Sequence, residues 1–192
     1  MSSNLGYESE KTLEDNLIKQ LCADGYEFVE INDIDDLHLN FRKQVNKHNA
    51  SRLNGHELSD KEFERLLVKI QGKGVYGSSK TLRSLQDITM DDGSTQYIEL
   101  FNTKNNEWCK NEFQVTHQVT MVGKYENRYD VTLLINGLPL VQIELKRRGI
   151  DFKEAFNQVI RYKKHSLNDL FRYVQIFIIS NGIDTKYFAN SD

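Results

Sequence analysis

Apolar residues recur at helical spacing near the start of the chain, where the pattern predicts an amphipathic helix over residues 10–23. Leu13 and Leu17 lie on its apolar face. Thr12 is the expected N-cap, and Gly25 follows the last turn, as glycine commonly does after a helix. The chain therefore opens with a helix that needs an apolar surface to pack against.

Further helices are expected over residues 36–52, 59–70 and 151–165. The second of these begins with Ser59 and Glu62, which have the spacing of a capping box. The inward stripe of the last helix is expected to hold Phe152, Phe156, Val159 and Ile160.

β-branched and aromatic residues predict strands over residues 26–31, 97–101 and 113–121. Residues 129–146 indicate two strands joined at Asn136-Gly137, a dipeptide that favours a tight hairpin turn. Residues 173–180 form a nearly continuous apolar run, typical of a strand buried on both faces. Helices that alternate with strands in this way predict an α/β layered fold.

The glycine-rich stretch over residues 71–80 resembles a phosphate-binding loop only in part. Gly72 and Gly77 have the separation of a Walker motif, but Ser78 stands where the lysine is required. We therefore expect no ATP hydrolysis by that route in this chain, and only turn-rich backbone in this stretch.

Composition adds that the chain is an ordinary folded protein: 192 residues, 39% hydrophobic and 28% charged, with a formal net charge of −3. The N-terminus has no apolar signal-peptide core, and no apolar run is long enough to span a bilayer. Cys22 and Cys109 make neither a disulfide framework nor a zinc pair. We expect a cytoplasmic protein with no membrane partner.

The modest net charge conceals a gradient along the chain. Residues 1–40 carry ten acidic and two basic side chains, whereas residues 142–165 carry seven basic and three acidic ones. One interpretation is two solvated faces. The other is a basic surface that meets phosphate beside an acidic cluster that holds a metal.

The hairpin at 129–146 decides whether its charged residues can act together. A three-residue loop would pair Ile135 with Pro139 and place Asp130 opposite Glu144. A two-residue Asn-Gly turn would put them on opposite faces, because a shift of one residue reverses the faces of a strand. A catalytic site here therefore predicts the longer loop or a β-bulge.

If Asp130 and Glu144 share a face, their carboxylates repel unless a cation lies between them, and hard oxygen ligands suit Mg²⁺. Lys146 would follow on the same face. The alternative is a salt-bridge ladder on the hairpin surface. Gln158 and Tyr162 are four residues apart on the next helix, with Arg161 beside them, a set suited to a nucleic-acid backbone. The alternative for Tyr162 is a core aromatic.

Asp130, Glu144-x-Lys146 and Gln158-x-x-x-Tyr162 together resemble the PD-(D/E)xK nuclease superfamily, in its branch with a Q-x-x-x-Y motif. Residues 127–149, 154–162 and 179–190 resemble, more closely, the N-terminal nuclease domain of the restriction (motor) subunit of type I restriction-modification enzymes.

The resemblance implies a restriction-endonuclease-like core, with a mixed central sheet flanked by helices. It implies that Asp130 and Glu144 bind Mg²⁺ (or Mn²⁺) with the main-chain carbonyl of Leu145, and that Glu14 completes the metal shell. Lys146 would be the catalytic lysine. Gln158 and Tyr162, with Arg161 beside them, would help to place DNA.

The resemblance also implies a single domain over residues 1–192, with a family-variable, helical and turn-rich region at 35–115. We expect an N-terminal fragment of a longer subunit, whose ATP-driven motor lies in the missing part. The implied partners are double-stranded DNA and the modification and specificity subunits. The alternatives are a non-catalytic nucleic-acid-binding or docking module with a nuclease-like fold, and a repair or junction-resolving nuclease of the same superfamily.

Overall fold

The computed structural model describes residues 9–71, 74–104, 110–122, 126–165 and 167–191. Its helices are α1 (Glu10–Ala23), α2 (Ile34–Asn49), α3 (Asp60–Ile70), α4 (Val75–Leu82), α5 (Phe152–His165) and the 3-10 helix η2 (Asp169–Tyr173). Its strands are β1 (Glu27–Phe28), β2 (Gln86–Thr89), β3 (Thr95–Ile98), β4 (Phe113–Val122), β5 (Glu126–Ile135), β6 (Leu138–Leu145), β7 (Ile176–Ser180) and β8 (Thr185–Ala189).

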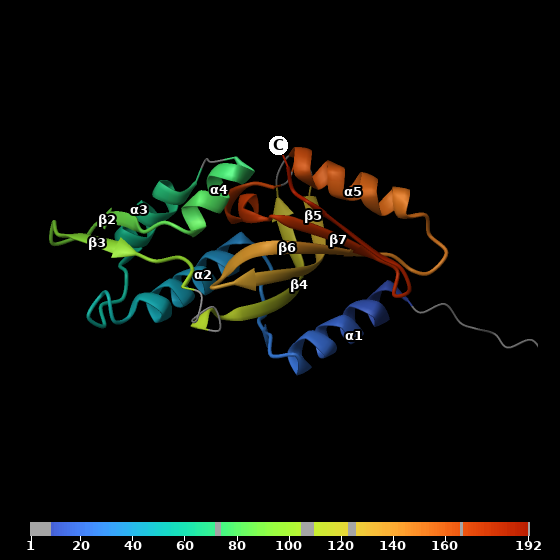
Figure 1. Cartoon of the computed structure of the whole chain (residues 1–192), viewed down its shortest axis with the longest axis horizontal. Coiled ribbons are helices and arrows are strands. Elements are labelled where there is room, and N and C mark those ends of the chain that lie inside the picture. Colours follow the sequence, from blue (N-terminus) through green and yellow to red (C-terminus); the bar gives the residue numbers. More distant parts are fainter. Residues whose placement is uncertain (1–8, 72–73, 105–109, 123–125, 166, 192) are drawn as a thin grey trace, which may run out of the picture.

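The central element is a mixed six-stranded sheet in the order β1-β4-β5-β6-β7-β8. β1 pairs with β4 in parallel, and β6 pairs with β7 in parallel, while the other neighbours are antiparallel. α1 and α5 cover opposite faces of this sheet (Figure 1). The expected α/β fold with a mixed sheet flanked by helices is therefore confirmed.

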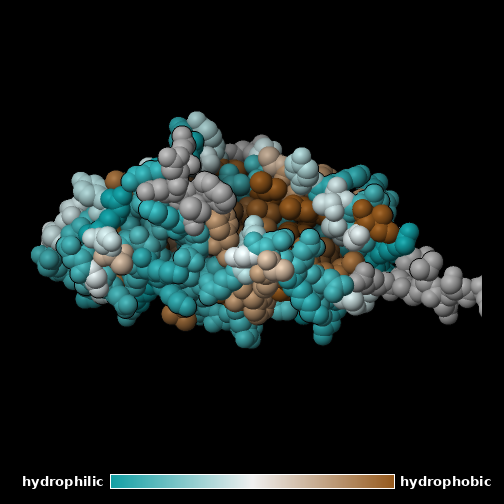
Figure 2. Space-filling model, turned by 60° about the horizontal axis from the view of Figure 1, so that its bottom comes forward, coloured by the Kyte–Doolittle hydropathy of each residue, from teal (hydrophilic) through white to brown (hydrophobic). Residues whose placement is uncertain are grey.

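The apolar residues form two clusters on the two sides of the sheet. The smaller one joins Val115, Val131, Ile143 and Leu145 to the leucines of α1. The larger one extends from α2 and α3 through the sheet to α5. In the view of Figure 2 the surface is mostly hydrophilic, with the most extended hydrophobic area near the middle and smaller ones elsewhere.

Helix α1 has the expected bounds but a different N-cap. Ser9 occupies that position in extended conformation, and its hydroxyl oxygen accepts a hydrogen bond from Thr12 N at 3.1 Å. Thr12 lies within the first turn, where its backbone is helical and cannot cap. The capping box of Ser59 and Glu62 at α3 is confirmed.

The region over residues 34–100 holds more regular structure than the sequence indicated. Helix α4 covers much of the predicted turn-rich stretch, and β2 pairs with β3 as a separate two-stranded sheet. Residues 72–73, and with them Gly72 of the glycine pattern, lie outside the described residues. The three elements α4, β2 and β3 have no strong periodic signal, because each is only four to eight residues long.

Two packing expectations are only partly right. The buried stripe of α5 is Ala155, Val159 and Tyr162. Of the expected residues, Val159 is buried and Phe152 packs against the core, whereas Phe156 is 44% exposed. Phe156 packs its ring against Phe188 of the edge strand β8, with the ring centroids 5.4 Å apart. The apolar run at 173–180 is strand only from residue 176, and Ile176 is 40% exposed, because α1 covers only part of its face of the sheet.

Candidate active site

The hairpin between β5 and β6 has a two-residue turn. Asn136 and Gly137 both have positive φ, 49° and 80°, as the tightest hairpin turns require. The strands next to the turn accordingly pair Ile135 with Leu138 and Leu134 with Pro139. Continued unchanged, this register would place Asp130 and Glu144 on opposite faces.

A β-bulge at Leu140 changes the register. Beyond it the pairs are Leu133–Val141, Thr132–Gln142 and Val131–Ile143, one residue out of step with the pairs at the turn. Leu140 is the additional residue, and its carbonyl accepts a hydrogen bond from Gln175 N at 2.8 Å. Asp130 and Glu144 are the next residues on their strands, so this register brings them opposite each other, and they are close enough for the charge of Asp130 to raise the pKa of Glu144. The expectation of a longer loop or a bulge is confirmed in the second form.

Asp130, Glu144 and Lys146 converge at the end of β6. One oxygen of Asp130, Oδ2, accepts a hydrogen bond from Leu145 N at 2.8 Å. Glu144 is fully buried, and its Oε1 accepts a hydrogen bond from Lys146 Nζ at 2.8 Å. The other oxygen of Glu144, Oε2, is buried and has no hydrogen-bond partner among the described residues.

The protonation of this group is strongly perturbed. Burial, followed by the charge of Asp130, raises the pKa of Glu144 to about 8. Burial also raises the pKa of Asp130, and outweighs the hydrogen bond from Leu145. Burial alone would lower the pKa of Lys146, but its hydrogen bond and charge interaction with Glu144 raise it. Two carboxyl groups that disfavour their charged forms next to one ammonium group are typical of a functional site.

A cleft of about 370 Å³ opens beside Asp130. Its lining consists of Glu10, Lys11, Glu14, His117, Gln118, Arg128, Asp130 and Leu145. Glu14 is buried in its wall and is held at both oxygens: Oε1 contacts His117 Nδ1 at 2.6 Å, and Oε2 accepts from Gln118 Nε2. Glu14 thus faces the same cleft as Asp130, whose pKa its charge helps to raise.

The sequence did not single out Glu10, His117 or Gln118. Glu10 accepts a hydrogen bond from Arg147 N at 3.0 Å, and its charge acts on Asp130, Glu144 and Lys146. His117 and Gln118 come from the middle of β4, more than a hundred residues from Glu14. No local spacing signals such contacts, because the sheet alone brings these segments together.

The donor set fits a hard divalent cation held by Asp130 and Glu144. The unpartnered Oε2 of Glu144 and the raised pKa values of both carboxyl groups mark a place that a positive charge would stabilise. Within the described residues, no group of three or more His, Cys, Asp and Glu side chains is close enough to form a metal shell. Glu14 lies nearby but is engaged by His117 and Gln118.

Gln158 and Tyr162 lie on α5 and are joined by a hydrogen bond from the amide to the hydroxyl oxygen. The Tyr162 hydroxyl donates to the carbonyl of Arg128 at 3.3 Å, and its ring packs edge-on against Tyr129. Tyr162 is 1% exposed, so it is a core aromatic that also reaches the edge of the site. Arg161 is exposed to solvent on the same helix.

Other expected features are present only in part. Arg147, Arg148, Lys153 and Arg161 are exposed in the basic strip, whereas the side chain of Lys164 lies outside the described residues. Cys22 is an exposed free thiol, and Cys109 lies outside the described residues. No helix in the described part of the chain is long and apolar enough to cross a membrane.

Comparison with known proteins gives a consistent result. Residues 7–192 match the family described as Type I restriction enzyme R protein N terminus. The chain is 53% identical over 186 residues to a type I restriction enzyme endonuclease subunit of Staphylococcus saprophyticus, covering 97% of this chain and 20% of that protein. It is 42% identical to the EcoprrI type I restriction enzyme endonuclease subunit of Escherichia coli, covering 96% of this chain and 60% of that protein. The chain thus spans about a fifth of the length of the staphylococcal relative.

Proposed function

Since the chain belongs to the family of type I restriction enzyme R protein N termini, we propose that it is the metal-dependent DNA endonuclease domain of a restriction subunit. Its site would be of the PD-(D/E)xK type, with Asp130, Glu144 and Lys146 in the catalytic roles. The substrate would be double-stranded DNA, delivered by an ATP-driven translocase in a part of the subunit that this chain does not include.

The observation that best supports the proposal is the bulge at Leu140. It converts a register that would separate Asp130 from Glu144 into one that brings them together. A bulge costs a ladder pairing and bends the strand, and bulges are frequent next to active sites, where they redirect a side chain. A simple surface ladder would not require a fully buried Glu144.

The cofactor would be Mg²⁺, with Mn²⁺ as a substitute, held by Asp130, Glu144 and the carbonyl of Leu145. Such an ion polarises a phosphodiester oxygen and lowers the pKa of a bound water. Glu144 must release its proton before Oε2 can act as a ligand. Lys146 keeps its proton, since its pKa is raised, and stabilises negative charge on the phosphate during attack by water.

DNA placement would divide between exposed and buried groups. Arg161 is exposed and available to a backbone phosphate. Tyr162 is buried, so its role would be indirect: with Gln158 it holds the Arg128 carbonyl two residues before Asp130. The modification and specificity subunits would be the protein partners, and the cytoplasm the place of action.

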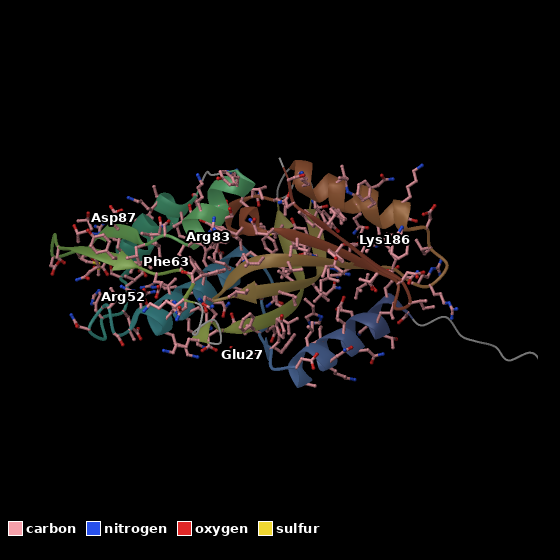
Figure 3. The ribbon with its side chains drawn as sticks, in the orientation of Figure 1. Glu27, Arg52, Phe63, Arg83, Asp87 and Lys186 are labelled. Carbon is pink, nitrogen blue, oxygen red and sulfur yellow. The ribbon has the colours of Figure 1, made fainter. Side chains whose placement is uncertain are left out.

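The test uses Asp130→Asn and Lys146→Ala in the restriction complex that contains this chain. We expect DNA cleavage to fall at least about 100-fold, the scale of losing one electrostatic group at a reaction centre. ATP hydrolysis should remain, because it belongs to the motor. Asp87→Asn is the matched control, since Asp87 lies in the lobe remote from β6 (Figure 3). Undiminished cleavage by either site variant would refute the assignment and favour a docking module.

A further inference from the structure

The backbone of Gln118 is unusual for a residue in the middle of a strand. Its φ is +55°, a conformation that costs a non-glycine residue about 1–3 kcal/mol unless its surroundings enforce it. The β4–β5 ladder pairs His117 with Val131 and Val119 with Tyr129, which leaves Gln118 and Asp130 between two regular pairs. The strained residue is therefore the cross-strand neighbour of the candidate catalytic aspartate.

At this point the two strands change the face on which their side chains lie. Val131 packs in the small cluster against α1, whereas Tyr129, two residues away, packs in the main core. In β4, Val115 and Val119 divide between the same two clusters. Regular alternation would keep residues an even number apart on one face. The irregularity at Gln118 thus lies beside the cleft, at the point where the side chains of both strands change from one face of the sheet to the other.

A hydrogen bond to Glu14 orients the side chain of Gln118 within the described part of the chain. Its Nε2 donates to Oε2 of Glu14, and exchanging its amide nitrogen and oxygen would bring two acceptors together. Its Oε1 consequently points away from the Glu14 carboxylate. That oxygen is buried, and no N–H or O–H group of the described residues donates to it. Leaving a buried acceptor without a donor costs about 1–3 kcal/mol.

We infer that Gln118 is a positioning residue of the nuclease site: its Nε2 fixes Glu14, and its Oε1 accepts a hydrogen bond from a water of the cation bound by Asp130. Mg²⁺ keeps several waters when proteins bind it, and oriented acceptors beyond its direct ligands hold them. The inference rests on the proposed function. It also gives the strained backbone a physical role, since the turn-over of β4 places this amide beside Asp130.

The test measures Mn²⁺ affinity by titration calorimetry without DNA, so that no catalysis is needed. Gln118→Met keeps the length of the side chain and removes both the donor and the acceptor of its amide group. We expect the Kd for Mn²⁺ to rise about 10-fold to 100-fold, the usual effect of losing a partner behind a metal ligand. Gln118→Asn, which tolerates positive φ, should also weaken binding, because its carbonyl is withdrawn by one methylene.

Gln114→Met is the matched control on the same strand. Gln114 is buried and also donates its amide to a glutamate, Glu27, at 3.0 Å. Glu27 lies at the other end of α1 from the cleft (Figure 3). This variant should lose stability but keep the Mn²⁺ affinity of the unaltered chain.

A second pair of variants separates the two roles of the amide. If Gln118 acts only by holding Glu14, then Gln118→Met should have no further effect on Mn²⁺ affinity once Glu14→Ala is present. We expect a further loss in that background, because Oε1 acts on the bound water directly. If Gln118→Met causes no further loss of Mn²⁺ affinity in the Glu14→Ala background, the inference is overturned and the proposed function is left intact. Failure of the unaltered chain to bind Mn²⁺, or binding indifferent to Asp130→Asn, would overturn both.

Discussion

Buried Glu144 should make the stability of the metal-free chain depend on pH in an unusual direction. A carboxyl group with a raised pKa binds its proton more tightly in the folded state than in the unfolded state. The stability that Glu144 contributes is therefore fully present below pH 4.5, the ordinary pKa of a glutamate. It is lost as the pH rises through about 8, the pKa of Glu144 in the folded chain. Most buried, ion-paired carboxylates have the opposite effect.

The size follows from the difference between the two pKa values. The pKa of Glu144 is about 8 in the folded chain and 4.5 in the unfolded chain, a difference of roughly 3.5 units. Each unit corresponds to about 1.4 kcal/mol, so the loss of unfolding free energy is about 5 kcal/mol. Lys146 contributes nothing to this change, because its raised pKa keeps it protonated throughout the window. A loss of this size would be a large part of the stability of an ordinary domain, which is about 5–15 kcal/mol.

The assay is urea unfolding in a metal chelator at several pH values from about 5 to about 9, for the unaltered chain and for Glu144→Gln. The quantity of interest is the difference between the two unfolding free energies. Other groups, such as His48, whose pKa is lowered by burial, contribute alike to the pH dependence of both proteins, so their contributions cancel in this difference. We expect the unaltered chain to lose about 4 kcal/mol relative to the variant over this range, because part of the total of about 5 kcal/mol is already lost below pH 5. Parallel pH profiles would refute the reasoning, since they would show that Glu144 titrates alike in both states.

Two further substitutions test the framework of the site. Gly137→Ala should cost about 3 kcal/mol of unfolding free energy, because its φ is +80° and a Cβ would lie 2.8 Å from the Phe41 backbone. Gly93→Ala is the control, with similar φ but open space around the new Cβ, and should cost about 1 kcal/mol. Equal losses for the two variants would contradict the close approach to Phe41. Tyr162→Phe should lower stability by about 1 kcal/mol by removing the hydrogen bond to the Arg128 carbonyl, measured by thermal unfolding. Unchanged stability with weakened DNA binding would instead indicate that the hydroxyl contacts DNA.

Much of the local structure was predictable because its signals are local. The apolar spacing of Leu13 and Leu17 and the capping box at Ser59 act within one or two helical turns, and the helices formed where those signals are. Asn136-Gly137 likewise requires only its own backbone to accept positive φ. Periodicity and turn chemistry thus determined which segments are helix, strand and hairpin.

The relative placement of the catalytic candidates needed the tertiary structure. Chain order alone allowed Asp130 and Glu144 to be together or apart, and the bulge at Leu140 decided between the two. That bulge is held from outside the hairpin, through the hydrogen bond from Gln175 to the Leu140 carbonyl. Which stripe of α5 is buried also depended on where the sheet lay against it.

The sequence by itself determined the elements, the hairpin and the residue types that suit a metal-dependent nuclease. Only the tertiary structure decided that Glu14 meets His117 and Gln118 across more than a hundred residues, and that β4 and β5 turn over beside Asp130. The physical reason is that side-chain alternation is a local rule, whereas register, bulges and the faces of a sheet are fixed by the packing of the whole molecule.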